Sequence, residues 1–198
     1  MKEELDNYLC QTYPKLFVNR HADKMETCMC WGFECGDGWF NILNQLCNNI
    51  QHHINWREDS YQRDLKYNSM LSDCKADKWD AFNEYYGNYR PEFFEKRKIE
   101  ILAEEPREIK LPCSQVTVEQ VKEKFGTLRF YYTGGDDYIS GLVSMAESMS
   151  GVTCETCGKP GTSTRGGWIK TACVEHGGED FDTPEDDETT LLKQGFEQ

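Results

Sequence analysis

The chain has 198 residues, enough for one well-cored domain with a small appendage. Its formal net charge of −13 argues against general binding to nucleic acid, whose phosphate backbone would be repelled. It also contains 10 cysteines, and its first residues lack the apolar stretch of a secretory signal. No run approaches the roughly 18 apolar residues of a membrane span. We therefore expect a cytoplasmic protein whose clustered cysteines are reduced and bind metal.

The first clear element is a helix that follows the turn signal Cys35-Gly-Asp-Gly-Trp39. Apolar residues from Trp39 to Ile54 recur at the i, i+3, i+4 spacing of one buried face, and Asp37 stands where an N-cap belongs. The spacing predicts a helix that ends near Ile54.

The segment 55–112 has a different character, because it is charged, uneven in period and rich in aromatic residues. Helical spacing is present at 75–86 and 91–103, and Pro91 suits a first helical turn. We expect a variable helical insertion.

A second amphipathic helix is predicted from Thr117. Thr117 and Gln120 fit a capping box, and the apolar stripe that follows consists of Val118, Val121 and Phe125. Gly126 then has the position of a C′ glycine that ends a helix.

The next residues predict a strand, a turn and a third helix. Residues 128–133 alternate and are aromatic, as in a strand. Gly134-Gly135 makes a turn, and Asp136 or Asp137 caps a helix over 138–149. That helix is expected to bury its apolar side chains: Ile139, Leu142, Val143, Ala146 and Met149.

Together these elements predict an α+β fold, with amphipathic helices on a short antiparallel sheet. The core domain covers 1–150 and includes the insertion. A zinc ribbon follows over 151–178. The last segment, 179–198, is acidic and aperiodic, and we expect it to be disordered.

The ribbon is predicted from two close ligand pairs, Cys154-x2-Cys157 and Cys173-x2-His176. Zinc takes four such ligands at tetrahedral corners, and two short pairs joined by a hairpin supply them. Gly158 and Gly177 follow the pairs and let backbone amides turn toward the sulfur. Four protein ligands leave no place for water, so the pattern indicates one structural zinc ion.

Three weaker groups remain open as sites. A second metal site is one interpretation of His21, Cys28, Cys30 and Cys35, and ordinary buried cysteines are the other. A metal-dependent phosphodiester hydrolase could use Asp37, Asp136 and Asp137, although helix capping explains these aspartates fully. A phosphate or nucleotide pocket, or alternatively a solvated strand face, is indicated by Arg129, Arg165, Trp168, Tyr132 and Lys124.

Two stretches together resemble a family of small, uncharacterised proteins of tailed bacteriophages and prophages. They are the Cys35–Trp39 motif with its helix, and Val121-Lys-Glu-Lys-Phe-Gly-Thr-Leu-Arg-Phe-Tyr-Tyr132 running into Cys154-Glu-Thr-Cys157-Gly. The matching regions are roughly 28–54 and 116–177. The resemblance implies a phage context, a zinc ribbon and the bacterial cytoplasm of a host, and it assigns no catalytic residues.

The resulting functional expectation is a non-catalytic accessory protein that binds and neutralises a host component, in particular a component of an antiviral defence. Two mechanisms stay open: blockade of a protein partner, and sequestration of a small nucleotide signal. No membrane and no sequence-specific nucleic acid are expected as partners.

Overall fold

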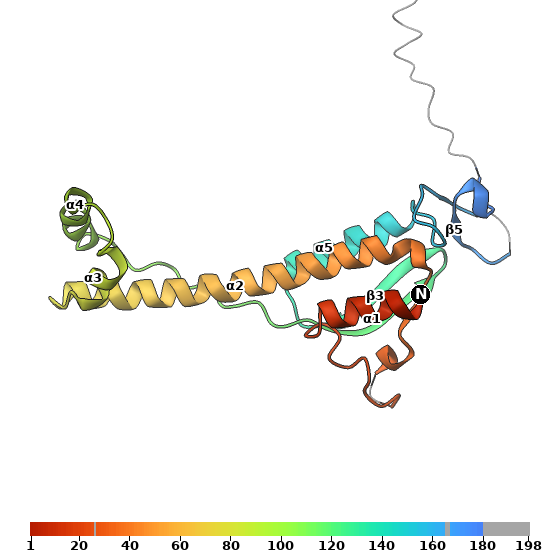
Figure 1. Cartoon of the computed structure of the whole chain (residues 1–198), viewed down its shortest axis with the longest axis horizontal. Coiled ribbons are helices and arrows are strands. Elements are labelled where there is room, and N and C mark those ends of the chain that lie inside the picture. Colours follow the sequence, from red (N-terminus) through yellow and green to blue (C-terminus); the bar gives the residue numbers. More distant parts are fainter. Residues whose placement is uncertain (26, 165–166, 180–198) are drawn as a thin grey trace, which may run out of the picture. The chain divides into compact units, whose positions relative to one another are not determined.

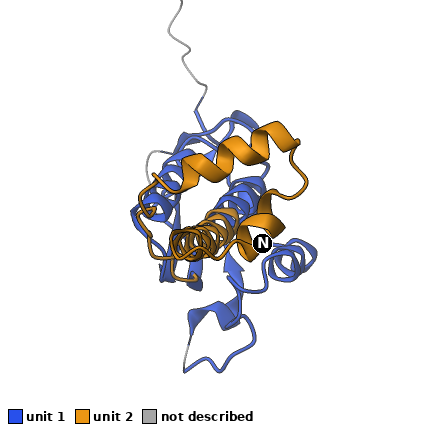
Figure 2. Cartoon of the chain, turned by 90° about the vertical axis from the view of Figure 1, so that its left-hand side faces the viewer, with its two compact units in different colours: residues 1–50, 116–198 blue, residues 51–115 orange. Residues whose placement is uncertain are grey.

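The computed structural model describes residues 1–25, 27–164 and 167–179 (Figure 1). Its chain divides into two compact units, which Figure 2 colours separately. The first unit contains Met1–Ile50 and Val116–Gln198, and the second contains Gln51–Gln115. The expected insertion has boundaries at 55 and 112. The residues of the expected disordered tail from 180 onward lie outside the described part.

The sheet of the first unit has three strands in the order β1-β2-β3. β1 (Phe33–Glu34) pairs in parallel with β2 (Thr117–Lys124), and β2 pairs antiparallel with β3 (Thr127–Thr133). The chain is thus mixed in helix and sheet, as the α+β prediction requires. The prediction of a purely antiparallel sheet was wrong, because β1 enters from a distant part of the sequence.

The prediction of a helix from Thr117 was wrong, since this segment forms strand β2. A β-bulge between Val118 and Gln120 inserts one extra residue. Val118 and Val121 are therefore both fully buried, although they are three residues apart. A separation of three residues between buried side chains is typical of a helix, but here it results from the bulge.

The glycine assigned to the end of that helix belongs instead to a two-residue hairpin turn. Lys124 pairs with Thr127, and the two residues between them, Phe125 and Gly126, have φ values of 54° and 79°. Two positive φ angles in succession are typical of a type I′ turn. The Phe125 side chain is 69% exposed and is not part of an apolar stripe.

α5 (Asp137–Ser150) confirms the predicted third helix, and the Asp136 carboxylate caps it by accepting the Ile139 N–H at 3.2 Å. Its inward face covers β3, the edge strand. The N–H groups of Leu128 and Phe130 donate to Ser150 Oγ at 2.7 Å and to Glu147 Oε1 at 3.0 Å. These side chains protect the edge from pairing with another chain. Among the expected buried residues, Ile139, Val143 and Ala146 are buried, whereas Leu142 is half-buried and Met149 is exposed.

A buried ion pair joins α1 (Glu3–Thr12) to the loop that follows it in the first unit. Arg20 binds the Asp6 carboxylate with two hydrogen bonds of 2.9 and 3.0 Å. Gly32, at φ 78°, packs against this pair, and a Cβ there would come within 3.0 Å of both partners. The loop also contains η1 (Cys28–Trp31).

The helix predicted after Trp39 is present as α2 (Phe40–Lys75), which continues far beyond the predicted end. Its start follows η2 (Asp37–Trp39), and Asp37 is not an N-cap: its carboxylate accepts the Lys2 N–H at 2.7 Å. No side chain between Asn55 and Lys66 is buried, so the apolar period disappears there. The helix persists because α2 contains neither glycine nor proline to end it.

The second unit is helical, as expected. It consists of the later part of α2, α3 (Asp80–Tyr86) and α4 (Pro91–Ile101), and Pro91 occupies the first turn of α4 as predicted. α2 ends in a Schellman motif, where Lys78 N–H bonds Asp73 O at 2.8 Å and Asp77 has a φ of 60°. The core of the unit is a cluster of buried side chains: Tyr67, Met70, Leu71, Cys74, Phe82, Tyr86 and Ile101.

Candidate metal centre

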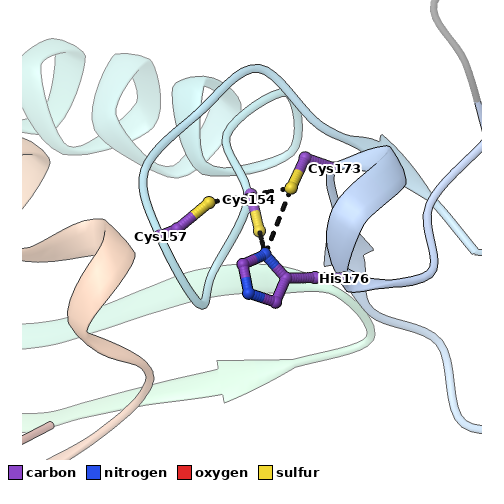
Figure 3. A group of neighbouring side chains, drawn as sticks. All are labelled: Cys154, Cys157, Cys173 and His176. Carbon is purple, nitrogen blue, oxygen red and sulfur yellow. Dashed lines mark hydrogen bonds between the residues drawn. The ribbon is translucent and has the colours of Figure 1, made fainter.

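The four predicted ligands come together in the first unit (Figure 3). One ligand atom from each of Cys154, Cys157, Cys173 and His176 lies within 4.8 Å of all the others. The Sγ atoms of Cys157 and Cys173 are 3.7 Å apart, and Cys154 Sγ is 3.6 Å from His176 Nδ1. Four donors at such distances can hold a metal ion.

These distances fit the geometry of a tetrahedral ion. With metal–sulfur bonds of about 2.3 Å and metal–nitrogen bonds of about 2.0 Å, tetrahedral angles require S–S separations near 3.7 Å and S–N separations near 3.5 Å. Two of the observed separations, 3.7 Å between Cys157 Sγ and Cys173 Sγ and 3.6 Å between Cys154 Sγ and His176 Nδ1, agree. The third, 3.1 Å between Cys173 Sγ and His176 Nδ1, is shorter, so these two groups would separate by about 0.4 Å around an ion. The nitrogen that faces the cluster is Nδ1.

Each ligand pair sits on a tight turn that ends in a glycine with positive φ. In the first, Gly158 (φ 78°) donates its N–H to Cys154 O at 2.8 Å. In the second, η3 (Val174–His176) is followed by Gly177 at φ 90°. A short hairpin, β4 (Thr162–Ser163) with β5 (Thr171–Ala172), joins the two turns. This is the arrangement that the ribbon prediction required.

Backbone N–H groups favour the deprotonated form of Cys154, which is the form that binds a metal ion. Burial alone would raise the pKa of the Cys154 thiol, but N–H groups of Cys173, Cys157 and Thr156 point at the sulfur and lower the pKa to about 6. The Lys159 N–H lowers the pKa of Cys157, yet desolvation and the neighbouring sulfurs outweigh it and raise this pKa overall. A group of sulfurs that compete for protons at close range is stabilised by a metal ion, which replaces the protons.

The turn motif at Cys35–Trp39 packs directly on the first ligand turn. Gly38 N–H donates to Glu155 O, and Gly36 N–H donates to Glu155 Oε1, both at 2.8 Å. A Cβ on Gly38 would come within 3.0 Å of the Cys154 carbonyl oxygen and of two amide nitrogens in the turn. The two glycines are therefore needed for backbone-to-backbone contact.

Trp39 completes this contact from the buried side. Its ring is fully buried, and its Nε1–H donates to Thr153 O at 2.8 Å, immediately before the first ligand. The contact between this motif and the ligand turn was not predicted from the sequence. The available signal was the joint occurrence of Gly-x-Gly-Trp with the Cys-x2-Cys-Gly turn in one chain.

The sequence-predicted ligand pocket is not assembled. Arg129 and Tyr132 are three residues apart on β3 and so point to opposite sheet faces. Arg129 Nη1 donates to Thr127 Oγ1 and to Leu128 O, both at 2.7 Å, and the Tyr132 hydroxyl lies 3.2 Å from Ser140 Oγ. Lys124 lies beside the Phe125 ring, and Trp168 is 75% exposed. Arg165 lies outside the described residues.

The other two candidate groups are also dispersed. Across the part of the chain that the structure describes, no ligand-type cluster unites His21, Cys28, Cys30 and Cys35. Burial raises the pKa of the Cys35 thiol to about 12, as for an ordinary core cysteine. Asp37 binds Lys2, Asp136 caps α5, and Asp137 is exposed in the first turn of that helix.

Comparison of the chain with protein-family models, with curated proteins and with solved structures finds no match. In the described ranges, no helix combines the length and the apolar character needed to cross a membrane.

Proposed function

We propose that the cluster binds one zinc ion and that this zinc is structural. Three thiolates and one imidazole form a donor set that suits zinc. Four protein ligands complete a tetrahedral shell, so the ion has no position left for a substrate or a reactive water. The observation that carries the proposal is the docking of Gly36 and Gly38 on the Cys154–Cys157 turn, which makes the metal-bound turn a part of the core.

We infer further that the protein acts by binding, since the proposed ion itself supplies no catalytic position. The resemblance to phage proteins supports a host component as the target, in particular a component of an antiviral defence. Protein blockade would use the acidic surface against a basic partner. Sequestration would use a pocket that holds a small nucleotide.

Metal analysis of protein purified under reducing conditions tests the proposal. One zinc per chain is expected, with three sulfurs and one nitrogen around it in X-ray absorption spectra. Cys157→Ser should lose this stoichiometry and unfold the C-terminal third of the chain. Cys28→Ser, which removes an exposed thiol outside the cluster, is the matched control and should retain one zinc.

Two results would contradict a structural zinc: a full zinc content in Cys157→Ser, or an oxygen ligand at an open coordination position. The proposed target is tested separately, by infecting cells that carry different defence systems with phage that has or lacks the gene. A phage whose growth is independent of the gene in every such host would refute counter-defence.

A further inference from the structure

The second unit contains a cavity of about 490 Å³ that the metal centre does not involve. Its volume lies within the range of roughly 300–1,000 Å³ that is usual for small-molecule sites. Nine residues line it: Arg63, Lys66, Tyr67, Ser69, Met70, Ala81, Glu84, Tyr85 and Arg107.

Helical periodicity explains how these side chains meet. Arg63, Lys66, Tyr67 and Met70 stand at i, i+3, i+4 and i+7 of α2 and share one face. Ala81, Glu84 and Tyr85 have the same relation in α3. The buried parts of this lining, Met70 and Tyr67, belong to the core of the unit. The cavity thus has an apolar floor and a polar rim.

The rim is positively charged although the whole chain is strongly acidic. Three lining residues are basic and only Glu84 is acidic. Arg107 is neutralised in part by Asp64, whose Oδ1 is 3.1 Å from its Nη1. The exposed side chains of Arg63 and Lys66 make no ion pair or hydrogen bond with any residue in the described part of the chain. Two cations are therefore available to a ligand.

Arg107 is held in place at the cavity wall. Its backbone N–H and C=O bond the Asn68 side chain, both at 2.8 Å. Its guanidinium lies 3.7 Å from the centroid of the Tyr67 ring. The Tyr67 hydroxyl is fixed in turn by Arg97 Nη2 at 2.8 Å and by Glu104. Such a stacked, hydrogen-bonded arginine is ordered before a ligand arrives, which lowers the entropy cost of binding.

We propose that this cavity binds a nucleotide that carries at least two phosphate groups. Arg63 and Lys66 contact the phosphates, because unpaired cations at a concave rim attract a compact polyanion. The ring of Tyr85, which is 56% exposed, supplies a face on which the base stacks. This site deepens the proposed binding function by naming the class of ligand. It rests on the proposed function in one respect, namely that the protein holds the nucleotide without converting it.

Calorimetric titration of the full-length zinc-loaded protein with ADP, adenosine and pyrophosphate tests the site. ADP should bind more tightly than either fragment, since it alone offers both the phosphates and the base. The double variant Arg63→Ala/Lys66→Ala should weaken ADP binding by at least about tenfold. Raising the salt concentration should weaken the wild-type interaction and affect the double variant less.

Lys78→Ala/Arg90→Ala is the matched control, because it removes the same charge from two other exposed positions of the second unit. It should change ADP affinity by less than about twofold. Equal losses in both double variants, equal binding of ADP and pyrophosphate, or no ADP binding at millimolar concentration would each overturn the proposal. Chromatography of the recovered nucleotide separates the two proposals: conversion of bound ADP would refute the non-catalytic function and leave the binding site intact.

Discussion

Gly38→Ala is the substitution that tests most directly whether the Cys35–Trp39 turn and the metal centre form one structure. The added methyl group would come within 3.0 Å of the Cys154 carbonyl oxygen and of the Cys157 and Gly158 amide nitrogens. All three are backbone atoms of the ligand turn, so no side-chain rotation can relieve the clash. The two segments must therefore move apart.

The cost follows from what this movement breaks. Gly38 N–H to Glu155 O, Gly36 N–H to Glu155 Oε1 and Trp39 Nε1–H to Thr153 O are the hydrogen bonds at risk. At about 1 kcal/mol each, with about 1–3 kcal/mol for overpacking, the folded unit should lose about 4–6 kcal/mol. Because metal binding and folding are linked, a loss of about 4 kcal/mol corresponds to a roughly thousandfold weaker zinc affinity.

Urea unfolding and zinc competition with a chromophoric chelator measure the two effects. Gly141→Ala is the control, because a Cβ at this exposed position of α5 meets nothing within 4 Å. It replaces a helical glycine and should stabilise the protein by up to about 1 kcal/mol, with unchanged zinc affinity. If Gly38→Ala behaved like Gly141→Ala in both assays, the contact between the motif and the ligand turn would be refuted.

Three further predictions concern the core, a buried charge and the hairpin turn. Trp39→Ala should destabilise the protein by about 3–5 kcal/mol in urea unfolding, since the ring is fully buried; a near-neutral result would show that the ring is exposed. Burial raises the pKa of Asp6, but the hydrogen bond and charge of Arg20 outweigh it and hold this pKa below 3.8. A carboxylate whose pKa is lower in the folded than in the unfolded protein stabilises the folded state at pH values above the unfolded-state pKa. This stabilisation is lost as the pH falls, so wild-type stability should decline below about pH 4. Asp6→Asn should lower stability near neutral pH by about 3 kcal/mol and flatten that decline, and an unchanged pH profile would count against the ion pair. Phe125→Asn should stabilise the protein by about 1 kcal/mol and so raise the melting temperature, because asparagine tolerates the positive backbone φ better and the Phe125 side chain is exposed; a lower melting temperature would mean that the Phe125 ring is held by contacts.

The elements that sequence reasoning predicted correctly depend on local chemistry. The capped helix α5, the alternating strand β3 and the glycine-terminated ligand turns are each specified by a few adjacent residues. The failures have physical causes that a short window does not contain. The bulge at Glu119 places two buried valines three residues apart, which is a helical spacing within a strand. α2 continues through 55–66 without a buried face because this stretch contains no glycine or proline to end the helix.

The candidate sites divide in the same way. The metal ligands could be predicted because each pair is contiguous and its glycine is next to it. The nucleotide cavity could not, although its arginine and tyrosine types were the ones expected for such a pocket. Arg63 and Lys66 lie in a stretch of α2 with no buried residue. Arg107 joins them through its ion pair with Asp64, its stacking on Tyr67 and its hydrogen bonds with Asn68. Those contacts bridge about forty positions of the sequence.

The docking of the Cys35–Trp39 turn also explains why a small, half-exposed metal centre should matter to the whole first unit. β1 is only two residues long, so its pairing with β2 fixes the preceding segment weakly. The turn after β1 is supported by the ligand turn, through the Gly36 and Gly38 contacts with Glu155, and by Lys2, which binds Asp37. On the hairpin side, Thr171 Oγ1 donates to Gly126 O at 2.5 Å, so the ribbon also contacts the β2–β3 turn. If the proposed zinc ion orders the ribbon, its removal should loosen β1 and the β2–β3 turn before α5, because the ribbon contacts the turn after β1 and the β2–β3 turn.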